Sequence, residues 1–115
     1  MARQREIRTF LPRYRPLARV SRSARLLFVG LFTVADDEGR ARASPAGLAY
    51  LLFPVDADAP ELVPAWLDEL EREGLIERYK VDGIDYLHIV DWRKFQYVRH
   101  PTPSRLPPAP GERHA

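Results

Sequence analysis

The sequence predicts one small α+β domain, in which three helices and a short strand precede a β-hairpin. Three observations lead to it. A chain of 115 residues has room for a single core. Capping and stop residues bracket each long apolar run, and an Asp82-Gly83 turn separates two runs of alternating hydrophobicity. We therefore predict a basic arm over 1–20, a folded domain over 21–98 and a proline-rich basic tail over 99–115.

The first helix is predicted from about Ser23 to Ala35. Ser21 or Ser23 can cap it, and the acidic turn 36–39, ending in glycine, stops it. A short strand over 40–43 should follow. The leucines and valine spaced three or four apart place one apolar face on this helix: Leu27, Leu31 and Val34.

Two more helices are predicted, over Pro45 to about Leu52 and over about Glu61 to Glu73. Ser44 before Pro45 is an N-cap followed by proline at the first helical position. Asp58 and Glu61 have the spacing of a capping box. Gly74 should end the third helix in the C′ position.

The hairpin over 76–89 has a register that a two-residue turn determines. Asp82-Gly83 favours a type I′ turn. Lys80 then faces Asp85, and opposite charges across two strands support that pairing. The same register gives the further pairs Val81 with Ile84, Tyr79 with Tyr86, Glu77 with His88 and Ile76 with Ile89.

The core predicted from these patterns combines residues of all three helices and the hairpin: Leu27, Phe28, Leu31, Leu48, Leu51, Trp66, Leu70, Ile76 and Ile89. The segment 91–98 is either a helical turn or an irregular packing strap. Five prolines from Pro101 onward predict a mobile tail, with little to bury after about Arg105.

The order helix, strand, helix, helix, hairpin is that of a winged helix. Residues 45–73 would form the helix-turn-helix and residues 76–89 the wing.

Charge is distributed unevenly along the chain. Residues 1–25 hold eight arginines and one acid, a net +7, whereas residues 26–92 hold five bases and fourteen acids, a net −9. Residues 93–115 carry +4. Basic arms beside an acidic body suggest a polyanionic partner such as nucleic acid. The alternative is that the arms fold back on the acidic body.

The chain resembles the small winged-helix domains at the N-terminus of phage replication proteins, of the replisome-organiser and DnaD-like kind. The similarity covers about residues 3–108. It rests on Ser23 to Phe28, Ala35 to Arg40, Leu67 to Ile76, Tyr79, Asp82-Gly83, Tyr86, Trp92 to Gln96 and Pro101 to Pro107. It implies DNA binding in replication initiation, in a bacterial cytoplasm or from a prophage. Relatives often have histidine where Phe95 stands, and longer relatives continue past the proline tract.

No set of residues predicts catalysis, a metal or a cofactor. The chain has no cysteine, and its histidines, His88, His100 and His114, are scattered. Asp36, Asp37 and Glu38 are ordinary turn residues before a glycine, although they could in principle hold magnesium. There is no glycine-rich phosphate loop. The longest apolar run is too short to span a bilayer, and the basic N-terminus lacks a signal-peptide core, so we expect a cytoplasmic protein that is not an enzyme and has no membrane partner.

The third helix is poorly suited to reading bases, since it presents acids around a single suitable base, Arg72. Phosphate contacts are instead expected from the arms and the wing. The candidate DNA-binding residues are Arg3, Arg5, Arg8, Arg13, Arg15, Arg72, Arg78, Lys80, Arg93, Lys94, Arg99 and Arg105. Interleaved aromatics can stack on unpaired bases or pack on the core; they are Phe10, Tyr14, Trp92, Phe95 and Tyr97.

Three functions follow from these patterns. The first is DNA binding, to double or single strands. The second is a protein-interaction adaptor whose acidic third helix docks a basic partner such as a helicase or its loader. The third is a transcriptional regulator. Arms that clamp onto the acidic helix would favour the adaptor, and arms that project beside the wing would favour DNA binding.

Overall fold

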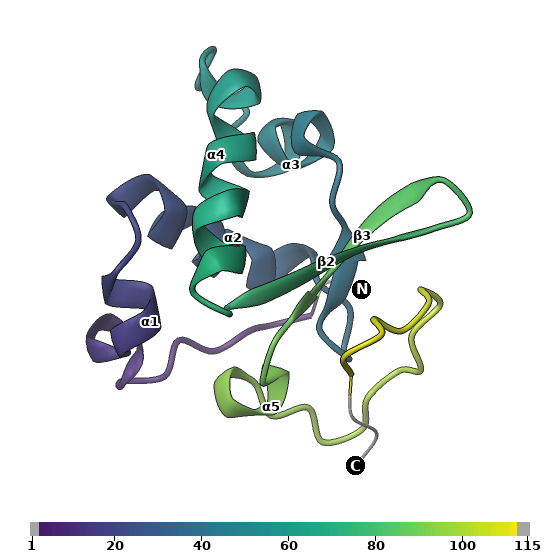
Figure 1. Ribbon diagram of the computed structural model, residues 1–115. Helices are drawn as coiled ribbons and strands as arrows, with labels where there is room; N and C mark the ends of the chain where they lie inside the picture. The colour runs from purple at the N-terminus through teal and green to yellow at the C-terminus, as the bar shows by residue number, and fades with distance from the viewer. Residues whose placement is uncertain (1–2, 113–115) are drawn as a thin grey trace.

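The structure is a computed structural model that describes residues 3–112 (Figure 1). The ends of the predicted arm and tail, including His114, lie outside these residues. The elements in chain order are η1 (Leu11–Arg13), α1 (Arg15–Ala18), α2 (Arg22–Val34), β1 (Arg40–Arg42), α3 (Pro45–Leu52), α4 (Ala59–Arg72), β2 (Ile76–Val81), β3 (Ile84–Ile89) and α5 (Trp92–Phe95). The α+β class is confirmed.

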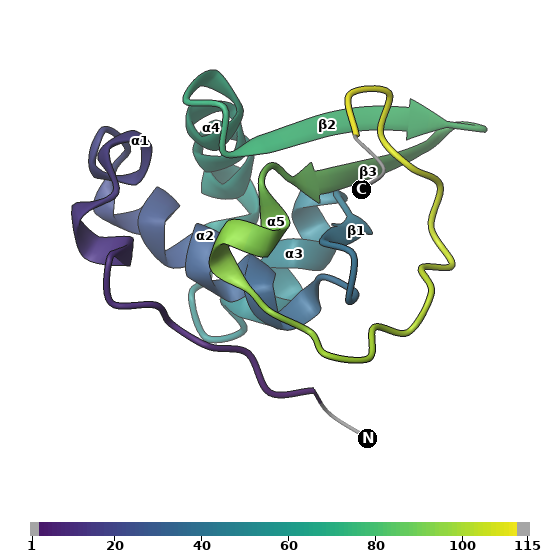
Figure 2. The ribbon, with the colours of Figure 1, turned by 90° about the horizontal axis from the view of Figure 1, so that it is seen from below.

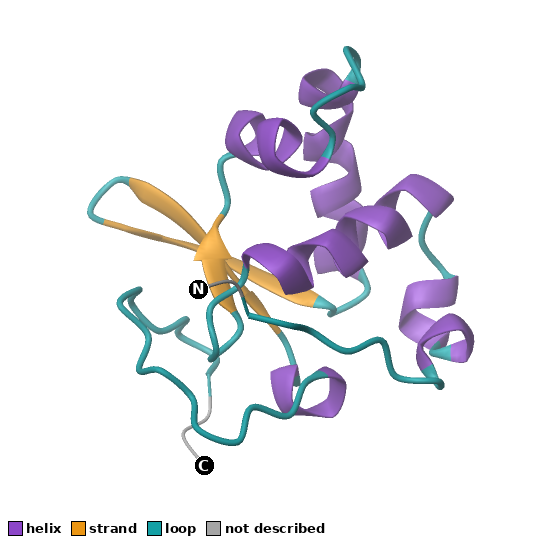
Figure 3. Ribbon diagram, turned by 180° about the vertical axis from the view of Figure 1, so that it is seen from behind, coloured by secondary structure: helices purple, strands orange, loops and turns teal. Residues whose placement is uncertain are grey.

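The three strands form one antiparallel sheet in the order β1-β3-β2. In Figure 1, α3 and α4 lie on one side of the β2-β3 hairpin, and α5 with the following tail lies on the other. Figure 3 shows the same division from behind, with α1 at the opposite end of the molecule from the hairpin tip. Within the described residues, no helix combines the length and apolar character needed to cross a membrane.

The segment before α2 is more structured than the predicted extended arm. Pro12 and Pro16 exclude a long helix, as expected, but each lies in the first turn of a short one, where a missing N–H is tolerated. Leu11 and Leu17 are buried at these turns. The two turns therefore pack onto the domain.

Ser21 caps α2, because its Oγ accepts a hydrogen bond from the Ala24 N–H at 3.2 Å. The predicted stop is also confirmed. Asp36 Oδ1 accepts from the N–H groups of Glu38 and Arg40, which closes the acidic turn and directs the chain into β1. The helix boundary and the turn are thus both determined by local side-chain hydrogen bonds.

Helix α3 has the predicted bounds and the predicted Ser44 cap, but Leu51 is not in the core. Its side chain is 60% exposed, whereas Leu48 is buried. A Cβ on Gly30 of α2 would come within 3.1 Å of Leu52, so the bare glycine leaves room for Leu52 to pack there. Leu52 therefore takes the inward position and Leu51 turns outward.

Helix α4 begins two residues before the predicted start, and the predicted capping box does not form. Asp58 has helical backbone angles and its side chain makes no cap hydrogen bond. Its carbonyl instead accepts from the N–H groups of Glu61 and Leu62. At the other end Gly74 has φ +73°, and the Leu75 N–H donates to the Leu70 carbonyl, which is the predicted glycine stop.

The hairpin has the predicted register throughout. Asp82 and Gly83 both have positive φ, as a type I′ turn requires. Lys80 lies 3.0 Å from Asp85 across the strands, and the rings of Tyr79 and Tyr86 stack with centroids 5.7 Å apart. Strand β1 then pairs with β3 and completes the sheet.

Aromatic side chains join the N-terminal turns to the core. Phe95 of α5 is buried and lies within 6.0 Å, between ring centroids, of Phe10, Tyr14, Phe28 and Phe32. The core reading of Phe10, Tyr14, Trp92 and Phe95 is therefore confirmed, and Tyr97 alone of the five is exposed. Trp66, predicted in the core, is half-buried against Phe53.

The tail up to residue 112 folds back over the sheet, contrary to the expected mobile end (Figure 2). Ala109 is buried, and Tyr79 donates its hydroxyl to the Pro107 carbonyl at 2.6 Å. Burial raises the pKa of Tyr79 to about 12. The prolines prevent regular structure here, but a buried contact does not need a helix or strand.

Candidate nucleic-acid interface

The N-terminal arm lies across the end of α2. The Arg5 guanidinium donates to the carbonyls of Phe32 at 3.0 Å and Ala35 at 2.9 Å, groups that the end of a helix leaves without intrahelical partners. It also lies 5.3 Å from the centre of the Trp92 ring. The Arg5 side chain is only 7% exposed, and its contacts attach the arm to the end of α2.

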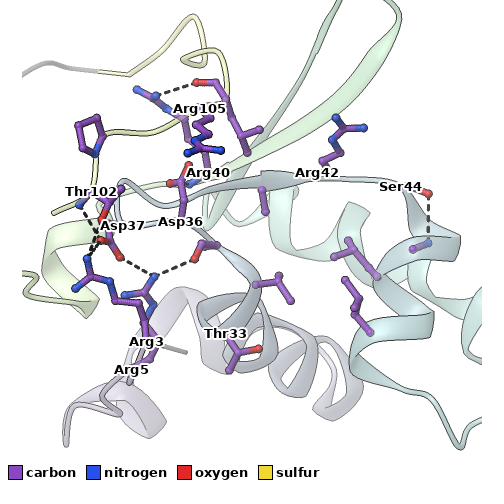
Figure 4. A pocket seen from close by; sticks show the side chains of 18 residues that line it. Arg3, Arg5, Thr33, Asp36, Asp37, Arg40, Arg42, Ser44, Thr102 and Arg105 are labelled. Carbon is purple, nitrogen blue, oxygen red and sulfur yellow. Dashed lines mark hydrogen bonds and ion pairs between the residues drawn. The ribbon is translucent and has the colours of Figure 1, made fainter. Parts of the chain in front are cut away.

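Asp37 is the point where the arm and the tail meet (Figure 4). Its carboxylate lies 2.6 Å from Arg3 and 3.1 Å from Arg5, and it accepts the Thr102 N–H at 2.9 Å. Burial by itself would raise the pKa of Asp37, but the hydrogen bonds and the two arginine charges lower it below the ordinary value. The neighbouring Ser104 binds the same turn through Asp36 and Glu38.

The next part of the arm is paired with the chain after α5. The Glu6 N–H donates to Gln96 Oε1, and Gln96 Nε2 donates back to the Glu6 carbonyl at 2.7 Å. Arg8 forms an ion pair with Glu6 at 3.0 Å. Arg13 is exposed and donates to the Thr9 carbonyl at 3.0 Å.

Of the two hairpin bases predicted to bind DNA, one is held by α4. Arg78 donates to Glu71 at 2.8 Å and also pairs with Asp68. Burial would lower the pKa of Arg78, but these two carboxylates raise it. Lys80 remains exposed, although it lies beside Asp85.

Six further exposed basic side chains lie on the N-terminal turns, the first turn of α2 and α5. We call this set the basic surface: Arg13, Arg15, Arg22, Arg25, Arg93 and Lys94. All six are exposed, and within residues 3–112 none has a carboxylate at ion-pair distance. Lys94 lies 5.0 Å from the centre of the Tyr14 ring, which joins α5 to the N-terminal turns.

Two residues of the basic surface, Arg22 and Arg25, were not among the candidates chosen from the sequence. Their spacing of three on a helix is the signal that could have identified them, because it places both on one side of the first turn of α2. Arg42 was also missed, and it is exposed at the end of β1.

The exposed side of α4 stays acidic. Arg72 is 61% exposed and its closest carboxylate, that of Glu73, is 3.9 Å away. Glu69 accepts from both the N–H and the hydroxyl of Ser21, and Glu73 pairs with Arg19 at 3.5 Å. Thus α4 holds the end of the arm and the short link to α2 through Arg19 and Ser21, whereas Arg3 and Arg5 near the start of the arm are paired with Asp37.

The two tail candidates, Arg99 and Arg105, are exposed, and within the described part of the chain neither has a carboxylate partner. Beyond Arg105, the tail is attached to β1 through Glu112, which lies 2.9 Å from Arg40. Burial by itself would raise the pKa of Glu112, but hydrogen bonds from Arg40 and from the Ala109 N–H lower it. Arg105 is therefore exposed on a loop whose far end is attached to β1.

Of the side chains that could act in catalysis or bind a metal, His88 is partly buried in the sheet. His88 faces Glu77 in the hairpin and lies 3.7 Å from Glu112, but burial lowers its pKa, so the ring is neutral at pH 7 and the contact is not an ion pair there. Among residues 3–112 no three histidine, aspartate or glutamate side chains are arranged to hold a metal ion.

No family model, no curated protein and no solved structure matches this chain.

Proposed function

We propose that this chain is a non-catalytic DNA-binding protein of the winged-helix kind, in a replication-initiation role such as the resemblance implies. The observation that carries the proposal is the basic surface: six exposed cations without carboxylate partners among the described residues. Cations whose charge is not neutralised within the protein are those that gain most from replacing the counterions of DNA.

The order of elements supports the winged-helix part of the proposal. Helices α2, α3 and α4 precede the β2-β3 hairpin, and β1 adds to the hairpin through β3. On this interpretation α3 and α4 are the helix-turn-helix and residues 76–89 are the wing.

The distribution of charge determines the mode of binding that we propose. Exposed Glu61 and Asp68 on α4 would repel phosphates, so this helix would not enter a major groove. Arginines and a lysine on the basic surface would contact phosphates instead. Such binding is sensitive to salt and has little sequence preference.

An adaptor remains the second candidate, and one observation favours it. Leu62 on α4 is 40% exposed beside Glu61, which gives this acidic helix an apolar side chain for a protein partner. On this alternative, α4 binds a basic partner and contact with DNA is incidental.

The test is a salt titration of binding to double- and single-stranded DNA by the wild type and by an Arg15→Ala, Arg93→Ala, Lys94→Ala triple variant. If all three side chains touch phosphates of duplex DNA, the log–log salt slope should decrease by about 2–3, at about 0.9 for each lost contact. Affinity should decrease about equally for unrelated sequences.

Arg72→Ala is the matched control, because it removes an exposed base from α4. It should leave the salt slope nearly unchanged. If it abolishes a sequence preference while the triple variant binds normally, α4 reads the groove and the proposed surface is wrong. If the wild type binds no DNA at low salt, the adaptor takes the place of this function.

A further inference from the structure

A groove of about 750 Å³ lies between the end of α2, β1, α3 and the tail (Figure 4). Its aliphatic lining is contributed by Val34, Ala41, Leu48, Leu51 and Leu106. Arg42 on β1 and Arg105 on the tail also line it. The groove therefore combines an apolar floor with basic side chains.

The arginines of the groove differ in whether their charge is already balanced. Arg3, Arg5 and Arg40 also line it, but the first two are paired with Asp37 and the third with Glu112. Arg42 and Arg105 are exposed and, within residues 3–112, have no carboxylate at ion-pair distance. The two acids that line the groove, Asp36 and Asp37, are engaged by groups of the chain itself, so the charges left without a partner are basic. An occupant with both apolar and acidic groups complements this lining, which an inorganic anion does not.

The chain itself displays such a segment between α3 and α4, at residues 55–62, which we call the acidic segment. Val55 is 91% exposed and Leu62 is 40% exposed. The three acids of the segment, Asp56, Asp58 and Glu61, are exposed, and none has a basic partner among the described residues. In Figures 1 and 3 the loop that starts this segment forms one extremity of the molecule.

A chain's own acidic segment is not seated in its own groove. The segment leaves the C-terminal end of α3, whereas the groove runs along the side of the same helix toward Ser44 and β1. Further exposed apolar side chains lie near the C-terminal end of α3, where Tyr50 and Leu51 are 78% and 60% exposed. Clusters of exposed apolar groups mark interaction surfaces.

We propose that two copies of this chain associate, with the acidic segment of each seated in the groove of the other. Val55 meets the aliphatic floor, and Asp56 and Asp58 meet Arg42 and Arg105. Because each copy offers both halves, one two-fold axis satisfies both contacts at once, as in most homodimers. The interface involves α3 and β1 and leaves the basic surface uncovered, so it does not depend on the proposed function.

Sedimentation of the wild-type chain over a wide range of concentration is the first measurement. The mass should change from one chain to two as concentration increases, with a weaker dimer at high salt. Arg42→Glu with Arg105→Glu should weaken dimerisation about tenfold or more, because like charges then face each other. Asp56→Arg with Asp58→Arg should have the same effect. These four side chains make no hydrogen bond within the described residues, so folding should be unaffected.

Mixing the two double variants is the decisive measurement. At a concentration where the wild type is mostly dimeric, each variant alone should be mostly monomeric. In the mixture, the reversed groove of one meets the reversed segment of the other, and the remaining pair is unchanged. The mixture should therefore recover a dimer of one copy of each. Arg72→Glu, a reversal at the end of α4 outside the groove, is the control and should dimerise as the wild type does.

The contact between Val55 and the aliphatic lining of the groove is tested separately. Val55→Ser should also weaken the dimer while leaving thermal unfolding of the monomer unchanged. A wild type that stays monomeric at every concentration overturns the proposal, as does a dimer that the reversals leave intact or the mixture fails to restore. Binding of an oligonucleotide that Arg42→Glu abolishes and Arg72→Glu preserves, without self-association, would assign the groove to nucleic acid instead.

Discussion

Arg40 and Glu112 form a buried ion pair that fastens the end of the described chain to β1. The Arg40 Nε and both terminal nitrogens lie within 3.1 Å of Glu112 oxygens or of the Leu106 carbonyl. Each side chain is 7% exposed. Removing one partner of such a pair leaves the other charge buried and uncompensated.

Glu112→Ala should therefore destabilise the protein by about 2 kcal/mol or more, measured by urea unfolding. Arg105→Ala, an exposed change in the same tail, is the control and should stay within about 0.5 kcal/mol. If a chain cut after Leu106 is as stable as the full chain, the tail contacts contribute nothing and the mobile tail expected from the prolines is the better description.

Arg5→Ala should affect stability and leave DNA affinity unchanged. It removes the donors to the Phe32 and Ala35 carbonyls and one partner of buried Asp37. We expect a loss of about 2–4 kcal/mol in the free energy of unfolding. Arg15→Ala, on the basic surface, should show the reverse pattern. A normal unfolding curve for Arg5→Ala together with weakened DNA binding would return the arm to the role first expected for it.

Stability should decrease as the pH falls below the ordinary value of 6.5 for histidine. Burial lowers the folded pKa of His88, so the unfolded chain binds a proton more readily and stability is lost as pH decreases through this range. Unfolding free energies measured from about pH 7 to pH 5 should show this slope, and His88→Gln should remove most of it. An identical slope in the variant would assign the dependence to other groups.

A second loss of stability should follow at acidic pH, where the carboxylates become protonated. The folded pKa values of Asp37 and Glu112 are below the ordinary 3.8 and 4.5, so their contributions are present above those values and disappear as pH falls through the folded ones. Asp37→Asn should be less stable than the wild type at neutral pH, and the difference should diminish in acid. A difference that stays constant with pH would show that the charge of Asp37 is not what matters.

Core substitutions should separate the predicted from the actual core. Leu31→Ala and Leu70→Ala, at fully buried positions, should each destabilise the protein by about 2–5 kcal/mol. Leu51→Ala should stay near 0.5 kcal/mol in the monomer, because that side chain is mostly exposed. A large effect at Leu51 would show that α3 is rotated relative to the structure.

Local chemistry along the sequence was sufficient to predict most of the secondary structure. Ser21, Ser44 and Gly74 act on backbone groups within a few residues of themselves, so their roles can be read without knowing the fold. The hairpin register follows for the same reason, since a two-residue turn and a period of two leave one pairing. Asp58 failed as a cap because its backbone continues the helical turn.

Which arginines are free was decided by the tertiary structure alone. A count along the chain treats all eight N-terminal arginines alike. Yet Arg5 is neutralised by Asp37, 32 residues away, whereas Arg13 has no carboxylate partner among residues 3–112. Whether two charges cancel depends on a separation of a few ångströms, and composition carries no information on that distance. The sequence by itself determined the three longer helices, the hairpin and the excess of charge at each end. Only the folding of distant segments onto one another determined which of those charges face solvent.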